Sequence, residues 1–213
     1  MRPRLLLLDV NETLSDTAAM AGAFARAGAA PELAGTWFAS VLRDGFALAA
    51  AGAGAPFVDL ARHHLGRLAG PERAEQLLEA FLALDVHPDV RTGLPRLAEA
   101  GVRVATLSNG SASVAEDLLE RAGVREHVEA CLSVEDAGVW KPHPRSYRWA
   151  VERLGVDAAE AALVAVHPWD TDGAARAGLG SVWVDRTGEP YPPYLRAPGR
   201  TVTSFDELAE ALG

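Results

Sequence analysis

The chain has 213 residues, of which 49% are hydrophobic, and it carries a net charge of −9. This length fits one domain with an insertion or two small domains, and the negative charge argues against a nucleic-acid or anionic-membrane surface. A cytoplasmic location is expected, because no apolar run is long enough to span a bilayer and Met1 to Leu8 is too short for a signal peptide. The single cysteine, Cys131, excludes an internal disulfide.

The first patterned stretch is a run of four leucines, Leu5 to Leu8, that leads directly into Asp9. A short continuous apolar run is typical of a strand buried on both faces, as at the centre of a parallel sheet. Asp9 then lies at the carboxyl end of that strand, where open α/β sheets bind their ligands. The alternative is that Asp9 only caps the following turn.

Residues 15–86 differ in pattern from the rest of the chain. Apolar residues recur there at helical spacing, Gly and Pro separate the segments, and no strand pattern interrupts them. The predicted helices span residues 18–27, 33–50, 57–68 and 71–84. We therefore expect a helical domain inserted directly after the first strand.

Strands and helices alternate regularly after residue 86. Predicted strands cover residues 102–107, 130–134, 162–166 and 181–185, and predicted helices cover residues 91–100, 112–122, 144–154, 170–177 and 205–212. The tail around Tyr191 to Tyr194 is expected to form an irregular loop. This alternation predicts an α/β domain with a parallel sheet covered on both faces, built from residues 1–14 and 87–213.

Three more polar stretches follow predicted strands. Ser108 and Asn109 end one strand before a turn that can present hydrogen-bond donors to an anion. Lys141 is the only lysine among 20 Lys and Arg residues, and Asp170 opens the helix after another strand. Each stretch also has a simpler interpretation: helix caps for the first and last, and a solvated surface charge for the lysine. Taken together with Asp9, they indicate one site at the ends of the strands.

The order and spacing of these residues resemble the haloacid dehalogenase superfamily, and within it the type II 2-haloacid dehalogenase branch. The motifs DVNETL, LSNGS, WKPHPRSY and HPWDTDGAARAGL each fall at a strand end. The resemblance implies a Rossmann-like parallel-sheet core, residues 1–14 and 87–213, with an inserted helical cap domain, residues 15–86. In the cap, only the segment from Trp37 to Phe57 suggests the active-site helix of that branch.

The resemblance also implies a role for each matching residue. Asp9 would be the nucleophile and Thr13 would orient it. Lys141 would keep Asp9 ionised, because a nearby cation lowers the pKa of a carboxyl group, and Asp170 would position or activate the hydrolytic water. The residues expected to bind the substrate are Val10, Asn11, Ser108, Asn109, Tyr147, His167 and Trp169 from the core, with Phe38, Arg43 and Phe57 from the cap.

The implied activity is hydrolysis of a carbon–halogen bond in a small 2-haloacid. A carboxylate attacks the carbon that carries the halide, and water then cleaves the resulting enzyme ester. No metal and no other cofactor is expected. The expected partner is a small acidic molecule, with no nucleic acid and no membrane, and a homodimer remains an open alternative.

A Mg²⁺-dependent phosphatase of the same superfamily is the competing interpretation. Such enzymes place a second aspartate two residues after the nucleophile, where this chain has Asn11, and an amide cannot donate and recover a proton. They also place an acidic residue at one of the positions that Ala165 and Val166 occupy here. If Mg²⁺ did bind, its ligands would be Asp9, the main chain of Asn11, and Asp170.

The chain also departs from the dehalogenase pattern. Phe38 stands where a cap arginine receives the halide, and Arg43 is the candidate substitute. His167 replaces a usual asparagine, either as a proton carrier or as a polar residue satisfied at the strand end. A degenerate protein that binds a small acid or a partner without catalysis is a third interpretation. We further expect five apolar cap residues to form a wall that faces Asp9: Trp37, Phe38, Leu42, Phe46 and Phe57.

Overall fold

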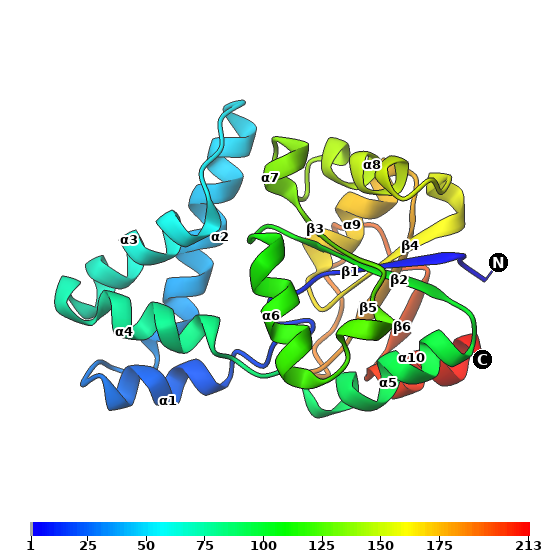
Figure 1. The fold of residues 1–213 in the computed structure, drawn as a ribbon. Helices are drawn as coiled ribbons and strands as arrows, with labels where there is room; N and C mark the ends of the chain where they lie inside the picture. Colours follow the sequence, from blue (N-terminus) through cyan, green and yellow to red (C-terminus); the bar gives the residue numbers. More distant parts are fainter. Residues whose placement is uncertain (1) are drawn as a thin grey trace.

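The computed structural model describes residues 2–213; Met1, the first residue of the predicted core segment 1–14, lies outside the described residues. Six parallel strands form one sheet in the order β3-β2-β1-β4-β5-β6 (Figure 1). The strands are β1 (Leu5–Leu8), β2 (Arg103–Ser108), β3 (Ala130–Ser133), β4 (Ala161–Ala165), β5 (Gly180–Val184) and β6 (Arg200–Val202). This arrangement confirms the predicted Rossmann-like α/β core.

Strand β1 is central because its four leucines are buried on both faces of the sheet. Leu6 and Leu8 pack on the side of α5 (Pro88–Glu99), α6 (Ala112–Ala122) and α10 (Phe205–Leu212). Leu5 and Leu7 pack on the side of α7 (Val134–Ala137), α8 (Pro144–Arg153) and α9 (Pro168–Ala177). The two helix layers lie on opposite faces of the sheet in Figure 1. None of the helices within residues 2–213 is sufficiently long and apolar to cross a membrane.

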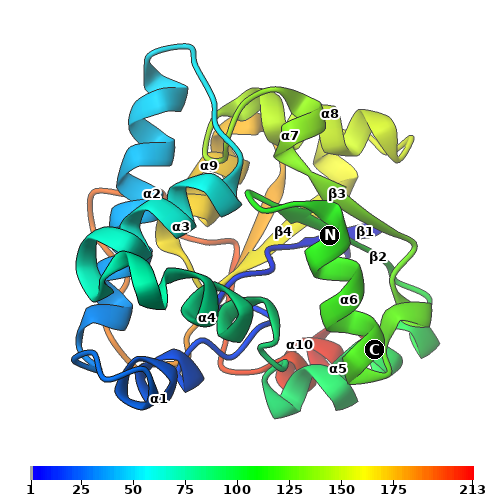
Figure 2. The same ribbon diagram turned by 60° about the vertical axis from the view of Figure 1, so that its left-hand side comes forward.

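Four helices stand apart from these layers, beside the carboxyl ends of the strands (Figures 1 and 2). They are α1 (Ala19–Arg26), α2 (Leu33–Ala50), α3 (Phe57–Ala69) and α4 (Pro71–Leu82). Phe24, Trp37, Leu65 and Leu77 are almost completely buried among them. We call this group of helices the cap.

The cap is attached to the core through two segments that run side by side. Ser15 and Val86 form an antiparallel bridge. On either side of the bridge, the Asp16 amide donates to the Asp85 carbonyl at 2.8 Å and the His87 amide donates to the Leu14 carbonyl at 2.8 Å. The chain therefore enters and leaves the cap at a single place, next to the turn that carries Asp9.

The structure corrects four details of the predicted elements. The tail contains the short edge strand β6, where a loop was expected, and helix α7 was not predicted. Helices α5 and α9 begin at Pro88 and Pro168, earlier than predicted, because proline is well suited to the first turn of a helix. Short 3₁₀ turns at Arg125–His127 and Ala158–Glu160 precede β3 and β4.

Candidate active site

A buried lysine joins two carboxylates at the carboxyl edge of the sheet. Asp9 follows β1, Lys141 precedes α8, and Asp170 lies in the first turn of α9. The Lys141 ammonium lies 2.8 Å from Oδ1 of Asp9 and 2.6 Å from Oδ2 of Asp170. All three side chains are almost completely excluded from solvent. A buried charge is tolerated only when it is paired, and here each carboxylate has the same ammonium as its partner.

The three groups differ in their affinity for protons. Burial raises the pKa of a carboxyl group, but Lys141 and His167 outweigh it and hold the pKa of Asp9 well below the ordinary value. Burial raises the pKa of Asp170, and its contact with Lys141 opposes this only in part. Burial disfavours the ammonium form of Lys141, but the two carboxylates raise its pKa. Asp9 is therefore a carboxylate, and Asp170 is the better proton acceptor of the two.

Hydroxyl groups fix the orientation of both carboxylates. The Thr13 hydroxyl donates to Oδ2 of Asp9 at 2.7 Å and accepts the Val166 amide at 3.1 Å. The Tyr147 hydroxyl donates to Oδ1 of Asp170 and is itself buried. Each hydroxyl donates to one particular carboxylate oxygen, so hydrogen bonds within the protein fix the orientation of both buried carboxylates.

His167 contacts the same oxygen of Asp9 as Thr13 does. Its Nδ1 lies 3.0 Å from Oδ2 of Asp9, and its Nε2 lies 2.8 Å from Oε2 of Glu12. The sequence motifs do not single out Glu12 as a site residue. Its contact with His167 depends on the unusual backbone of the turn, where Glu12 has φ = 64°, and no pattern of residue types reveals such a conformation.

Polar and apolar side chains line a small hollow on one side of the site. Its volume is about 150 Å³, and its walls include Asn11 and Ser108 from the core and Phe57 from the cap. Ser108 accepts the Gly110 amide at 2.9 Å, which leaves its own hydroxyl hydrogen free to donate. The side chain of Val10, in contrast, packs into the core below.

Asn109 lies at the site but is engaged with the main chain of Lys141. Its Oδ1 accepts the Lys141 amide at 2.9 Å, and its Nδ2 donates to the Lys141 carbonyl at 3.4 Å. Both ends of the amide therefore serve to hold Lys141 in position.

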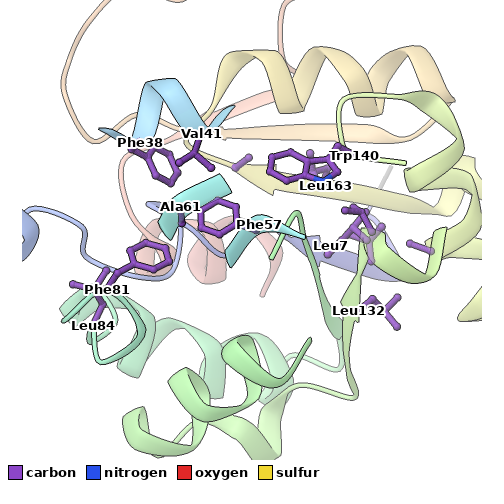
Figure 3. Packing of buried hydrophobic residues seen from close by; sticks show 14 of the residues in the cluster. Leu7, Phe38, Val41, Phe57, Ala61, Phe81, Leu84, Leu132, Trp140 and Leu163 are labelled. Carbon is purple, nitrogen blue, oxygen red and sulfur yellow. The ribbon is translucent and has the colours of Figure 1, made fainter. Parts of the chain in front are cut away.

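The cap residues divide between the site and the interior of the cap. Phe38 stacks on the ring of His167, with centroids 6.3 Å apart, and Phe46 meets Trp169 edge to face at 4.9 Å. Phe57 stacks on Trp140 of the core at 5.9 Å (Figure 3). These contacts support part of the expected apolar wall.

Two expectations for the cap were wrong. Trp37 does not face Asp9: its indole nitrogen donates to the Ala61 carbonyl at 3.0 Å, and its ring is buried inside the cap. Arg43 does not reach the site either, because it is paired with Asp44 at 2.8 Å and its side chain is 64% exposed. The apolar face of α2 supplies Phe38 to the site and leaves Arg43 on the outer face.

The carboxylates of the site do not form a metal centre. Asp170 uses one oxygen on Lys141 and the other on Tyr147, and Oδ2 of Asp9 already accepts two hydrogen bonds. Within residues 2–213, no group of three or more His, Cys, Asp or Glu side chains is arranged to hold a metal ion. Because Mg²⁺ requires several free oxygen ligands, the donor set does not fit the site expected of a phosphatase.

Comparison with known proteins identifies the family. A family model described as haloacid dehalogenase-like hydrolase matches residues 3–178. The chain belongs to the haloacid dehalogenase-like hydrolases. This hydrolase is 32% identical over 214 residues to (S)-2-haloacid dehalogenase 1 from Pseudomonas sp. (strain CBS-3), a match that covers 97% of this chain and 92% of that protein.

A second relative matches over a shorter stretch. The hydrolase is 36% identical over 135 residues to (S)-2-haloacid dehalogenase 4A from Burkholderia cepacia, covering 63% of this chain but only 58% of that protein's length. A similar solved structure is that of the L-2-haloacid dehalogenase from Xanthobacter autotrophicus with chloropropionic acid covalently bound. It superposes with a TM-score of 0.91 at 25% identity and covers 99% of this chain and 98% of that one.

Proposed function

We propose that this hydrolase cleaves the carbon–halogen bond of a small 2-haloacid through an ester of Asp9, without a metal ion. The observation that carries the proposal is the buried arrangement in which Lys141 lies between Asp9 and Asp170. The low pKa of Asp9 supplies an ionised nucleophile, and burial removes the water that would otherwise solvate it. The family and the names of its relatives point to the same chemistry.

In the first step, an oxygen of Asp9 displaces the halide and forms an ester. Oδ1 is suited to this attack, because it accepts one hydrogen bond, from Lys141, whereas Oδ2 accepts two. In the second step, water adds to Cγ of Asp9 and cleaves the ester. Asp170 is suited to take the proton of that water, because its pKa is raised.

The hollow beside Ser108 suits a small carboxylic acid. Its volume of about 150 Å³ limits the substrate to a few heavy atoms, and Phe57 and Phe81 provide apolar walls for an alkyl or halogen group. The Ser108 hydroxyl and the free N–H groups at the start of α6 can donate to the substrate carboxylate.

A single-turnover experiment in H₂¹⁸O, with enzyme in excess over a 2-chloro or 2-bromo acid, tests the covalent step. If Asp9 attacks carbon, the new hydroxyl of the first product carries ¹⁶O from the protein, and ¹⁸O appears in the protein. Asp9→Asn should lower halide release at least about a thousandfold, because an amide is not a nucleophile. Product that acquires ¹⁸O in the first turnover would mean that water attacks carbon directly.

Chelation separates this proposal from the phosphatase alternative. Halide release should be the same with and without EDTA. A phosphate-ester hydrolysis that EDTA abolishes would favour the phosphatase, and the absence of both activities would favour a protein that binds small acids without catalysis.

A further inference from the structure

Glu12 occupies a backbone conformation that favours glycine. Its φ of 64° makes it the only non-glycine residue with a positive φ within residues 2–213, and such a conformation costs a side-chain-bearing residue on the order of 1 kcal/mol. The turn holds Glu12 firmly: its carbonyl contacts Nε2 of His87 at 3.0 Å, and its Oε1 accepts the Thr17 hydroxyl at 3.1 Å. A strained residue beside a site indicates a role for its side chain.

The side chain of Glu12 completes a line of three groups. His167 lies between two carboxylates, with Nδ1 directed at Asp9 and Nε2 directed at Glu12. A carboxylate can only accept hydrogen bonds, so both ring nitrogens must carry a hydrogen for both contacts to form. Between two carboxylates, both contacts are satisfied together only by the doubly protonated, positively charged imidazolium.

Two aromatic rings stack beside this cation. The Phe38 ring lies 6.3 Å from the His167 ring with an interplanar angle of 21°, and the Trp169 ring lies 5.0 Å from it with an angle of 28°. A cation over an aromatic face is stabilised by the charge distribution of the ring. Burial alone would lower the pKa of His167, but the bonds to Asp9 and Glu12 outweigh it and raise the pKa to about 9.

The position of His167 matters for the second step of the proposed function, on which this inference rests. If Oδ1 of Asp9 bonds to the substrate, Oδ2 becomes the carbonyl oxygen of the ester. Thr13 and His167 are the two donors to that oxygen, at 2.7 Å and 3.0 Å. When water adds to Cγ, the electron pair of the carbonyl bond moves onto Oδ2, and donors already in place stabilise the charge.

We propose that His167 is the cationic half of an oxyanion hole for hydrolysis of the aspartyl ester, and that Glu12 is the positioning residue that keeps His167 protonated. The water hydroxyl bonds to Cγ, and the water proton goes to Asp170. The electron pair then returns from Oδ2, the Cγ–Oδ1 bond breaks, and Oδ1 leaves as the product hydroxyl. It takes a proton from Lys141, which recovers one from Asp170.

The overall reaction consumes one water molecule and releases one halide ion and one proton. Asp9 is left as a carboxylic acid, and it ionises again beside the cations Lys141 and His167. The proton released at that point accompanies the halide released in the first step. His167 itself gives up no proton in the cycle, so its charge must persist at the working pH.

Other charged groups face His167 across a hollow on the second side of the site. This hollow has a volume of about 530 Å³, and both His167 and Glu12 line it. The other titratable or charged side chains on its walls are Asp16, Glu32, His87 and Arg186. Glu32 lines the same hollow but makes no hydrogen bond to His167, so it provides a matched control for removal of an acid.

The test begins without substrate, by NMR titration of the His167 ring in the wild type, Glu12→Gln and Glu32→Gln. His167→Asn identifies the signal. Glu12→Gln should lower the pKa of His167 by more than one unit, and Glu32→Gln should leave it unchanged. Glu12→Gly provides a second variant with the same expectation, because glycine tolerates the positive φ and folding is then not at risk. An unchanged titration in both Glu12 variants would overturn the proposal.

Single-turnover kinetics then separate the two chemical steps. At pH 8.5, Glu12→Gln should slow hydrolysis of the ester about tenfold or more and change alkylation of Asp9 less than about threefold, so that the adduct accumulates in the intact-protein mass spectrum. Lowering the pH to 6 should restore hydrolysis. Slower alkylation with unchanged hydrolysis would overturn the proposal. A wild type that neither forms the adduct nor releases halide would instead refute the proposed function, and the titration would still decide whether Glu12 holds the charge.

Discussion

Lys141 lies fully buried with its ammonium between Asp9 and Asp170, and its place is fixed by main-chain bonds to Asn109. One cation thus serves two carboxylates that lie too close together to be ionised without it. The lowered pKa of Asp9 contributes stability that is fully present above the unfolded-state pKa and is lost as the pH falls from that value through the lower folded-state pKa. The raised pKa of Asp170 has the opposite sign, because burial of its charge costs stability as the pH rises.

Lys141→Met should therefore destabilise the protein in a pH-dependent way. Near pH 8 the free energy of unfolding should fall by about 3–5 kcal/mol, because two buried carboxylates lose their partner. Near pH 4 the loss should be smaller, because one of the two carboxylates takes up a proton. Urea unfolding at both pH values measures this difference, with the exposed Arg43→Met as control for removal of a cation. An equal loss at both pH values would show that Lys141 acts only through packing.

Much of the site could be predicted from residue types at strand ends. Asp9 and Asp170 converge because parallel strands end at one edge of the sheet, which holds for any chain with this alternation. Lys141 does not follow a strand directly, as the sequence suggested; it reaches the two carboxylates from the segment between α7 and α8. Glu12 could not be predicted in this way, since its contribution comes from one backbone angle. The outward direction of Arg43 depends on which face of α2 packs against the core, and sequence spacing alone left that open.

At the scale of elements, helix α2 meets the core through a glycine. Gly45 lies against the ring of Trp140, and a Cβ at this position would overlap the ring. The indole nitrogen of Trp140 also donates to the Ala55 carbonyl at 3.1 Å, so the core residue is held by the cap on two sides. The absence of a side chain at Gly45 sets how closely the cap approaches the core.

Gly45→Ala should push α2 away from Trp140. We expect a loss of about 1–3 kcal/mol in the free energy of unfolding from overpacking, together with reduced halide release because the cap closes less well over the site. Gly35→Ala is the matched control in the same helix, because its added Cβ meets nothing within 4 Å. This control should be neutral or stabilising by up to about 1 kcal/mol. Equal effects of the two variants would mean that the contact with Trp140 is unimportant.

The long helices and the buried strands were predicted from their apolar patterns, but the short elements β6 and α7 were not. Helix α2 buries a regular face, so its bounds of Leu33–Ala50 follow from the apolar spacing. Strand β6 has three residues and two of them are exposed, so it offers no apolar run to recognise. Helix α7 is a single turn held by the Ser133 hydroxyl, which accepts the Glu135 amide at 3.1 Å. Such short elements form because of their tertiary contacts, and a local sequence pattern does not reveal them.

At the scale of the whole molecule, the cap and the core share one apolar cluster. Figure 3 shows Phe57 and Phe81 of the cap in the same group as Trp140 and Leu163 of the core. Phe57 stacks on Phe81 of the cap at 5.6 Å and on Trp140 of the core at 5.9 Å, so the Phe57 ring contacts both domains at once. We expect the wild type to unfold as one cooperative unit.

Phe57→Ala should weaken this connection. The free energy of unfolding should fall by about 3–5 kcal/mol, as is usual for removal of a buried aromatic ring, and hydrogen exchange should accelerate in α2, α3 and α4 before it does in β1. Val58→Ala, which truncates the half-buried neighbour in the same helix, should cost roughly 1 kcal/mol without separating the two regions. If exchange accelerates equally in the cap and in β1, Phe57 does not control the coupling between them.

The bridge between Ser15 and Val86 defines the place at which the cap sequence could be exchanged for another segment. Because this bridge holds the two ends of the cap together, the core accommodates residues 17–84 in the same way as it would a closed loop inserted after β1. The entropy of closing a loop depends only weakly on its length, and each doubling costs roughly 0.6 kcal/mol. Segments of very different size could therefore be spliced in at this bridge while the chain path through β1 and the strand ends stays the same. Substrate choice and reaction chemistry can thus be altered separately, by exchange of one contiguous piece of sequence.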